Sequence, residues 1–338
     1  MKLKFLELSQ DERRLYFNQA AIRRNLDPVI MEKDFWVSWL LAILFNSEFG
    51  PSLVFKGGTS LSKVFGIIDR FSEDIDLSFS PAFLTLPRVG SSRNQANKWT
   101  KLAESACGIA FETRIQSYLE GIVGSILEKH TRPWFQFLID PATRSPILLF
   151  RYPSTQPDGF EYLNRSVKLE FGSLTDQQPS GTHEIRPWLG EVLPDAFEDW
   201  QCKVVALEIE RTFWEKATIL HSEYHRPSGK SIPDRYSRHY ADMASLAKHS
   251  CASSSVVQTA LRNRVIEWKK QFFSSAWSNY DLAKQGGLRL VPPPERQADL
   301  SRDYLAMRDM YLTEPESFES ILSTLADLEA KINQYERL

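Results

Sequence analysis

Two aspartates, Asp74 and Asp76, lie two residues apart in a segment that alternates polar and apolar side chains. In a strand this spacing puts both carboxylates on one face, with Ile75, Leu77 and Phe79 on the other. Carboxylates at this spacing are roughly 6–7 Å apart and repel each other by about 2–3 kcal/mol at an effective dielectric of about 20. Oxygen ligands that leave room for phosphate oxygens suit Mg²⁺ or Mn²⁺. The pair therefore predicts a divalent metal site; the alternative is a solvated strand edge that carries two aspartates for solubility.

A glycine turn lies upstream of this pair. Residues 53–55 (Leu-Val-Phe) indicate a short buried strand that leads into two consecutive glycines. Glycines permit a tight turn and let backbone N–H groups approach an anion closely. The following threonine and serine suit the first turn of a helix, where free N–H groups and the dipole favour phosphate. A phosphate-binding turn beside the aspartates favours the metal site over the solubility interpretation. Its candidate residues are Lys56, Gly57, Gly58, Thr59 and Ser60.

These two motifs together are similar to those of a known family. Gly57-Gly58-Thr59-Ser60 followed by Asp74-Ile75-Asp76 resembles the signature of the DNA polymerase β-like nucleotidyltransferase superfamily. More narrowly, 56–61 with 71–77 resembles the AbiEii/AbiGii family of abortive-infection toxins, which includes the mycobacterial MenT toxins. Three further blocks support the narrower resemblance and follow the family's order along the chain: Glu32–Trp36, Leu207–His221 and Arg235–Asp242.

The resemblance implies an α+β fold with two lobes. Residues 1–190 would form a polymerase β-like nucleotidyltransferase core around a small mixed sheet. Residues 191–338 would form a mainly helical lobe that closes over the active site. A chain of 338 residues is long enough to bury a core of this size.

The resemblance also implies roles for residues beyond the two motifs. Glu170, on an alternating segment with Lys168 on the same face, would be the third carboxylate of the metal site, as a ligand or as a base; its alternative is an ion pair with Lys168. Lys216 would neutralise nucleotide phosphates, where the residues alone favour an ordinary snorkelling lysine. Arg211 could assist it or simply pair with Glu215 four residues on. Asp242 would be a further site residue, with a surface pair to Arg238 as its alternative.

The implied reaction is transfer of a nucleoside monophosphate from an NTP to a hydroxyl, with release of pyrophosphate and Mg²⁺ or Mn²⁺ as cofactor. The implied acceptor is the 3′ end of tRNA, so that blocked aminoacylation halts translation. The protein would then be the toxin of a toxin–antitoxin or phage-defence system with a cognate antitoxin. The alternatives are a nucleotidyltransferase that modifies a protein or a small molecule, and a nucleotide- or RNA-binding module without turnover.

Composition sets limits that agree with this reading. The net charge of −2 excludes a surface coated in positive charge, although a local basic groove for nucleic acid remains compatible with it. No apolar run is long enough to span a membrane, and the N-terminus lacks a signal-peptide layout. Three widely spaced cysteines, Cys107, Cys202 and Cys251, indicate reduced thiols in a cytoplasmic protein.

The helices and strands that must position these residues are predicted from the spacing of apolar side chains and from the glycine, proline and capping residues at their ends. Helices are expected over 9–26, 28–47, from about 98 to 130, over 207–220 and over 301–337. Strands are expected over 53–55, 72–79, 135–139, 147–152 and 166–171, with a Pro-Ala-Thr-Arg turn between the third and fourth. Residues 81–97 contain the proline, glycine, serine and asparagine residues typical of a loop, and this loop could form a lid near the site.

Overall fold

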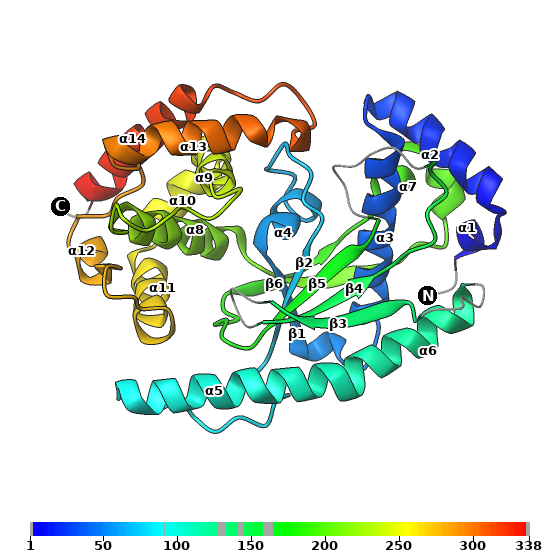
Figure 1. The fold of residues 1–338 in the computed structure, drawn as a ribbon, viewed down its shortest axis with the longest axis horizontal. Coiled ribbons are helices and arrows are strands. Elements are labelled where there is room, and N and C mark those ends of the chain that lie inside the picture. The colour runs from blue at the N-terminus through cyan, green and yellow to red at the C-terminus, as the bar shows by residue number, and fades with distance from the viewer. Residues whose placement is uncertain (1–2, 91, 128–132, 141–144, 158–164, 336–338) are drawn as a thin grey trace. The chain divides into compact units, whose positions relative to one another are not determined.

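The structure, a computed structural model, describes residues 3–90, 92–127, 133–140, 145–157 and 165–335. The chain divides into two compact units, each assembled from three segments (Figure 1). The first unit comprises Met1–Val64, Ser72–Gly90 and Lys98–Ala206, and the second comprises Phe65–Phe71, Ser91–Asn97 and Leu207–Leu338. The contiguous lobes of 1–190 and 191–338 stay a prediction.

Within the described residues, seven strands form one mixed sheet in the order β3-β4-β5-β2-β1-β7-β6. β2 pairs antiparallel with β1 and parallel with β5, while β4 is antiparallel to both β3 and β5. The strands are β1 (Leu53–Lys56), β2 (Ile75–Phe79), β3 (Phe135–Ile139), β4 (Pro146–Phe150), β5 (Val167–Gly172), β6 (Ser180–Glu184) and β7 (Lys203–Leu207). The mixed sheet combined with helices confirms the predicted α+β class.

The sheet has an apolar and a polar face because side chains alternate along its central strands. On the apolar face, Trp36 and Trp39 of α3 (Pro28–Phe45) lie against Phe150 of β4, with ring centroids 5.8 and 6.1 Å apart. On the same face, Phe111 packs on Phe171 of β5 at 4.5 Å. Burying each such ring contributes about 1.5–3 kcal/mol. The apolar face is therefore the core, and the polar face is left for chemistry.

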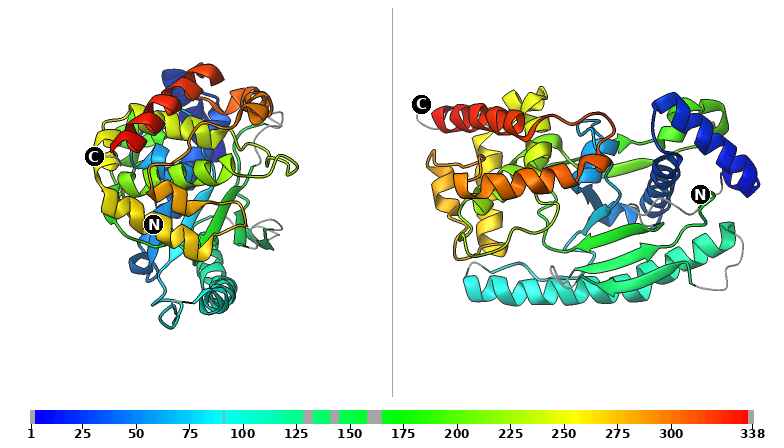
Figure 2. Two further views of the ribbon diagram at one scale, coloured as in Figure 1. Left: turned by 90° about the vertical axis from the view of Figure 1, so that its left-hand side faces the viewer. Right: turned by 45° about the horizontal axis from the view of Figure 1, so that its top comes forward.

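The other helices of the first unit surround this sheet. α5, η2 and α6 form one continuous rod, and its α6 end contacts β3 (Figure 2). The middle turn of the rod, η2, is a π-helix. The elements are α1 (Lys4–Glu7), α2 (Gln10–Arg24), η1 (Gly50–Ser52), α4 (Gly57–Lys63), α5 (Arg93–Ala110), η2 (Phe111–Ile115), α6 (Gln116–Ile126), α7 (Trp188–Val192) and η3 (Pro194–Phe197).

The second unit is helical throughout the regular elements that the structure describes. Its long helices α8, α9, α11 and α14 bury apolar stripes against one another. The elements are α8 (Ile209–Tyr224), α9 (Arg238–Lys248), α10 (Cys251–Val257), α11 (Thr259–Phe272), α12 (Tyr280–Lys284), α13 (Pro294–Ala306), η4 (Arg308–Met310) and α14 (Phe318–Tyr335).

Most predicted elements are present, with corrections at several boundaries. The strand expected over 72–79 begins at Ile75, so that Asp74 precedes it. α5 begins at Arg93 rather than near residue 98, because Ser92 and Gln95 exchange hydrogen bonds in a capping box that the loop interpretation overlooked. Leu207 ends strand β7 instead of opening the following helix, which begins at Ile209. The final helix begins at Phe318 rather than at residue 301. The Pro-Ala-Thr-Arg turn lies outside the described residues.

Candidate active site

The glycine turn lies directly against the acidic strand. β1 ends at Lys56, and Gly57 opens α4 with a φ of +81°, a conformation that side-chain-bearing residues rarely adopt. A Cβ placed on Gly57 would come within 2.1 Å of Oδ2 of Asp76. Only glycine therefore permits this contact, and it brings the predicted phosphate-binding turn and the predicted metal ligand together.

The side chains of Thr59 and Ser60 hold the turn in place. The Thr59 hydroxyl donates to the backbone carbonyl of Asp74, and the Ser60 hydroxyl donates to the carbonyl of Gly57 at 2.9 Å. Both residues are fully buried. The Thr59 hydroxyl thus fixes the turn to the acidic strand, and the Ser60 hydroxyl holds the turn itself. Phosphate binding by residues 56–60 stays a prediction that depends on backbone N–H groups and on Lys56.

The strand register aligns the predicted carboxylates on the polar face. Asp76 faces Glu170 across the parallel β2–β5 pair, and Lys56 faces Asp76 from β1. Extending the β2–β5 register by one residue beyond Ile75 and Leu169 sets Asp74, which immediately precedes β2, beside Lys168. Three acidic and two basic side chains therefore share this part of the polar face.

Lys168 is the cation of this group that pairs with Glu170. Its Nζ donates to Oε2 of Glu170 at 3.0 Å and lies 3.9 Å from a carboxylate oxygen of Asp140. Burial alone would lower the pKa of Lys168, but attraction to Asp74, Glu170 and Asp76 outweighs it and raises the pKa. The ion pair that the sequence offered as the alternative for Glu170 is therefore present.

The carboxylates suit a divalent metal in chemistry and register, since adjoining oxygen ligands on neighbouring strands are what Mg²⁺ and Mn²⁺ prefer. Within the described residues, however, no group of three or more His, Cys, Asp or Glu side chains lies close enough together to hold a metal ion. Asp76 and Glu170 are neighbours, and Glu170 has the ammonium of Lys168 as its partner. The metal roles of Asp74, Asp76 and Glu170 stay a prediction.

Three consecutive charged residues without a predicted role lie buried in α3. Glu32 accepts hydrogen bonds from the Ser154 hydroxyl at 2.6 Å and from the backbone N–H and hydroxyl of Thr155 at 2.7 and 2.9 Å. Burial raises the pKa of Glu32, and these hydrogen bonds oppose the rise. Its carboxylate therefore ties the segment that follows β4 to the middle of α3.

The next two residues of α3 hold the site itself. Lys33 pairs with Glu73, which adjoins the first aspartate. Asp34 accepts from Nζ of Lys63, at the end of α4, at 2.7 Å and from the N–H of Trp188 at 2.7 Å. One helix thus anchors both the acidic strand and the helix of the glycine turn. The signal in the sequence was present, because charges inside an otherwise apolar helix need buried partners.

Lys216 and Asp242 come together within the second unit, where a third residue joins them. Arg70 donates from Nε and Nη2 to the two carboxylate oxygens of Asp242 at 2.7 and 2.8 Å, and Lys216 donates to Oδ2 at 2.6 Å. Burial alone would raise the pKa of Asp242, but Arg70 and Lys216 hold it far below its usual range. The partner of Asp242 is therefore buried, unlike the surface pair with Arg238 that the sequence offered as an alternative.

Arg211 belongs to a separate ion cluster in the second unit. Its Nη2 donates to Glu215 at 2.6 Å, and Lys269 pairs with the other oxygen of the same carboxylate at 2.5 Å. The Arg211 side chain is fully buried. The i,i+4 pairing expected from the sequence is confirmed, and a role for Arg211 in binding nucleotide stays a prediction.

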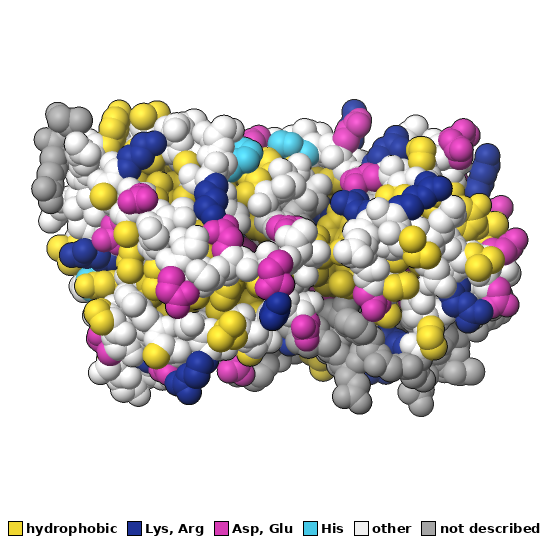
Figure 3. Space-filling view, turned by 90° about the horizontal axis from the view of Figure 1, so that it is seen from above, with side chains coloured by type: hydrophobic (Ala, Val, Ile, Leu, Met, Phe, Trp, Pro, Cys, Tyr) yellow, Lys and Arg dark blue, Asp and Glu magenta, His cyan; other side chains and the backbone are white. Residues whose placement is uncertain are grey.

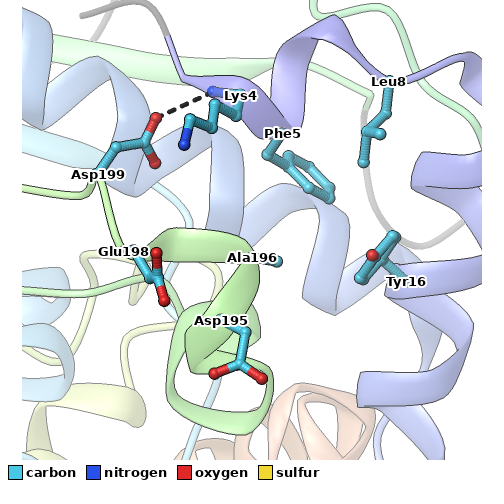
Figure 4. Close-up of a pocket in the computed structure, with 8 residues that line it drawn as sticks. All are labelled: Lys4, Phe5, Leu8, Tyr16, Asp195, Ala196, Glu198 and Asp199. Atoms are coloured by element: carbon cyan, nitrogen blue, oxygen red, sulfur yellow. Dashed lines mark hydrogen bonds between the residues drawn. The ribbon is translucent and has the colours of Figure 1, made fainter.

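A cavity and a surface of mixed charge lie away from the candidate site. A cavity of about 190 Å³ lies between the N-terminal helices and η3, where Phe5, Leu8 and Tyr16 face the carboxylate-bearing stretch of Asp195, Glu198 and Asp199 (Figure 4). It contains none of the predicted site residues.

On the face drawn in Figure 3, basic and acidic side chains of the described residues are interspersed. Among those residues no helix is long and apolar enough to cross a membrane.

Comparison with known proteins shows the family of the chain. Residues 39–324 match the family model described as nucleotidyl transferase AbiEii toxin of a type IV toxin–antitoxin system. The chain therefore belongs to the AbiEii family of nucleotidyltransferase toxins. Membership supports nucleotidyltransferase activity in general and implies an antitoxin partner.

Two solved structures are similar to nearly the whole chain at low identity. MenT4, a nucleotidyltransferase toxin from Mycobacterium tuberculosis H37Rv, is 17% identical with a TM-score of 0.48, over 96% of this chain and 92% of that one. JHP933 from Helicobacter pylori is 15% identical with a TM-score of 0.39, over 90% of each chain. No curated protein sequence matches the chain significantly.

Proposed function

We propose that this protein transfers a nucleoside monophosphate from an NTP to the 3′ hydroxyl of tRNA and releases pyrophosphate. The observation that carries the proposal is the close contact of Gly57 with Asp76, which faces Glu170 across the sheet. A turn able to receive phosphates then adjoins carboxylates able to receive the cation that accompanies them. Family membership supports the general reaction, and the tRNA acceptor rests on the resemblance of the motifs.

The first unit supplies the groups that would handle the triphosphate. Backbone N–H groups of Gly57 and Gly58, with the ammonium of Lys56, would bind phosphate oxygens. Asp74, Asp76 and Glu170 would hold Mg²⁺ or Mn²⁺, which supplies neutralising charge for the triphosphate when bound. Buried Lys33 and Asp34 would keep the two motifs in register.

The second unit would supply positive charge. Arg70 and Lys216 carry two positive charges against the single negative charge of Asp242, so the cluster has a net positive charge. Nζ of Lys216 has three N–H donors, and Asp242 accepts from it. Lys216, with Asp242 orienting it and Arg211 nearby in sequence, is the proposed counter-charge for the nucleotide.

A tRNA left with a nucleotide added to its 3′ end could not be aminoacylated, so translation would stop. The protein would act in the cytoplasm, where tRNA and NTPs occur, and its antitoxin would prevent this until phage infection or another stress. Abortive infection is the biological role that we propose for such a system.

The experiment that tests the proposal incubates the purified protein with each labelled NTP, Mg²⁺ and total RNA. Label should appear on RNA of tRNA size and should disappear when periodate first destroys the terminal 3′ diol. Asp76→Asn should abolish labelling, whereas Asp195→Asn, an exposed aspartate away from the site, should not. Label on protein with RNA untouched would assign a protein-modifying enzyme. Nucleotide binding without any label would assign a binding module.

A further inference from the structure

One charged side chain on the polar face of the sheet has no part in the proposed reaction. Lys168 extends from β5 beside Glu170, on the strand that adjoins the two aspartates. Its ammonium donates to Glu170 at 3.0 Å and lies 3.9 Å from Asp140, beyond the neighbouring strand β4. The position that oxygen ligands would offer to a metal is thus next to a protein cation.

The charges of this face are incomplete without that cation. Asp74, Asp76, Glu170 and Asp140 carry four negative charges, and Lys56 and Lys168 carry two positive ones, which leaves a net charge of −2. Without Lys168 the same group would have a net charge of −3. Like charges directly opposite each other destabilise a sheet, so Lys168 stabilises the arrangement of the carboxylates.

The Lys168–Glu170 ion pair also lies where a cation from solvent can replace the ammonium group. The side chains of Lys168 and Glu170 are 28% and 23% exposed, so aqueous ions reach them. Exchange of one cation for another costs little in a partly exposed pair of this kind, and a divalent cation interacts with a carboxylate more strongly than an ammonium does because it has twice the charge.

We propose that Lys168 is an internal counter-ion of the carboxylates, which keeps Asp74, Asp76 and Glu170 on one face in the absence of metal and is displaced from Glu170 when a divalent cation binds. This inference rests on the proposed function, because it assumes that the cation binds at these carboxylates. It assigns Lys168 a positioning role in the metal-free protein and makes it a competitor of the metal.

The consequence is a metal affinity that the protein itself limits. Each cation that binds must replace the ammonium at Glu170 and tolerate its charge nearby. Removing that charge should tighten metal binding by roughly tenfold, because a neighbouring unit charge repels the divalent cation across a partly exposed site. The same change should weaken the metal-free fold, since Glu170 loses its ion pair with Lys168 and the repulsion among the carboxylates increases.

The test compares wild type with Lys168→Met and Lys168→Arg, by Mn²⁺ titration in the absence of nucleotide and by thermal unfolding with EDTA and with Mn²⁺. Lys168→Met should bind Mn²⁺ about tenfold more tightly, unfold at a lower temperature in EDTA, and show a larger Mn²⁺-induced rise in Tm than wild type. Lys168→Arg keeps the charge and should bind Mn²⁺ as wild type does. Lys203→Met is the matched control, because it removes a β7 lysine whose partner Glu184 is 3.9 Å away and 80% exposed.

The outcomes separate this inference from the proposed function. Unchanged or weaker Mn²⁺ binding by Lys168→Met, with wild type binding normally, would overturn the counter-ion role and leave the metal site intact. Mn²⁺ binding by neither wild type nor any variant would overturn the metal site on which the inference depends. Equal tightening in Lys168→Met and Lys203→Met would show a general charge effect and would also overturn the role of Lys168.

Discussion

Two ion clusters of this protein differ in exposure and in net charge. On the polar face of the sheet, the carboxylates outnumber the ammonium groups, and the Lys168–Glu170 pair is 28% and 23% exposed. In the second unit, Asp242 lies between two cations, and the side chains of the three partners are 1–8% exposed. A partly exposed ion pair can change partners at little cost, whereas a buried one loses several kcal/mol when a single partner is removed. The first cluster is therefore suited to exchanging ions and the second to a fixed arrangement.

The largest effect expected is on catalysis at the exposed cluster. Asp76→Ala should lower nucleotidyl transfer about a thousandfold or more, since the metal that neutralises the triphosphate loses a ligand. The metal-free protein should keep its Tm or gain slightly, because one of three neighbouring carboxylates is gone. Labelling assays and thermal unfolding in EDTA measure the two quantities, with Asp195→Ala as the control. Full activity in a folded Asp76→Ala protein would refute the mechanism.

At the buried cluster the principal effect should be on stability. Asp242→Asn leaves the charges of Arg70 and Lys216 buried without their carboxylate, at a cost of about 3 kcal/mol in the free energy of unfolding. Urea unfolding measures this change. Asp281→Asn is the control, because its partner Lys270 is exposed and the pair should contribute less than about 1 kcal/mol. Equal losses in both variants would abolish the distinction between the clusters.

A substitution in the glycine turn tests how strongly the exposed cluster depends on the backbone beside it. Gly57→Ala should lower activity roughly a hundredfold, because the new Cβ would displace the carboxylate of Asp76 and small misplacements are costly in catalysis. Gly66→Ala separates strain from contact: Gly66 also has a positive φ, of +62°, but a Cβ there meets no atom within 4 Å. That variant should lose about 1 kcal/mol of stability and keep its activity. Similar activity losses in both would assign the effect to backbone strain.

The smallest effect expected is the pH dependence of stability at a third ion cluster, which Arg211, Glu215 and Lys269 form. Burial alone would raise the pKa of Glu215, but Lys269 and Arg211 outweigh it and lower the pKa to about 2. Because the pKa is lowered in the folded state, the stabilisation is complete above about pH 4.5 and is lost as the pH falls towards 2. The wild type should exceed Glu215→Gln by about 2 kcal/mol at pH 6 and by less at pH 3. Urea unfolding at both values measures it, and an equal difference at both would contradict the lowered pKa.

The sequence predicts the strands around the candidate site, with one error at a boundary. Alternation placed Lys168 and Glu170 on one face of a strand, because period-two patterning survives folding wherever one face is buried. It also placed both aspartates within a strand over 72–79, whereas β2 begins at Ile75 and Asp74 immediately precedes it. The helix expected from residue 28 does begin there as α3, with Asp27 as its capping residue. The glycine turn was predictable because few residues other than glycine adopt its backbone conformation.

The long-range partners could not be predicted from local patterns. Arg70 and Asp242 lie 172 residues apart in the chain, and Asp34 bonds to the N–H of a residue 154 positions away. Strand order, which sets Asp76 beside Glu170, is likewise decided by the packing of distant segments. The apolar sequence around Lys33 indicates that this lysine needs a buried partner, but nothing local in the sequence identifies that partner as Glu73.

The short excursion of residues 65–71 into the second unit affects how the chain can be divided genetically. There Phe71 donates its N–H to the carbonyl of Met310 at 2.7 Å, and Arg70 binds Asp242. A gene cut after residue 206 would therefore produce two fragments, of which the second lacks a strand-like segment and a buried cation that only the first carries. Co-expressed, the fragments should complement each other and co-purify; expressed singly, 207–338 should be unfolded and open to proteases. A chain of this kind could be made inactive by withholding one fragment and active again by supplying it.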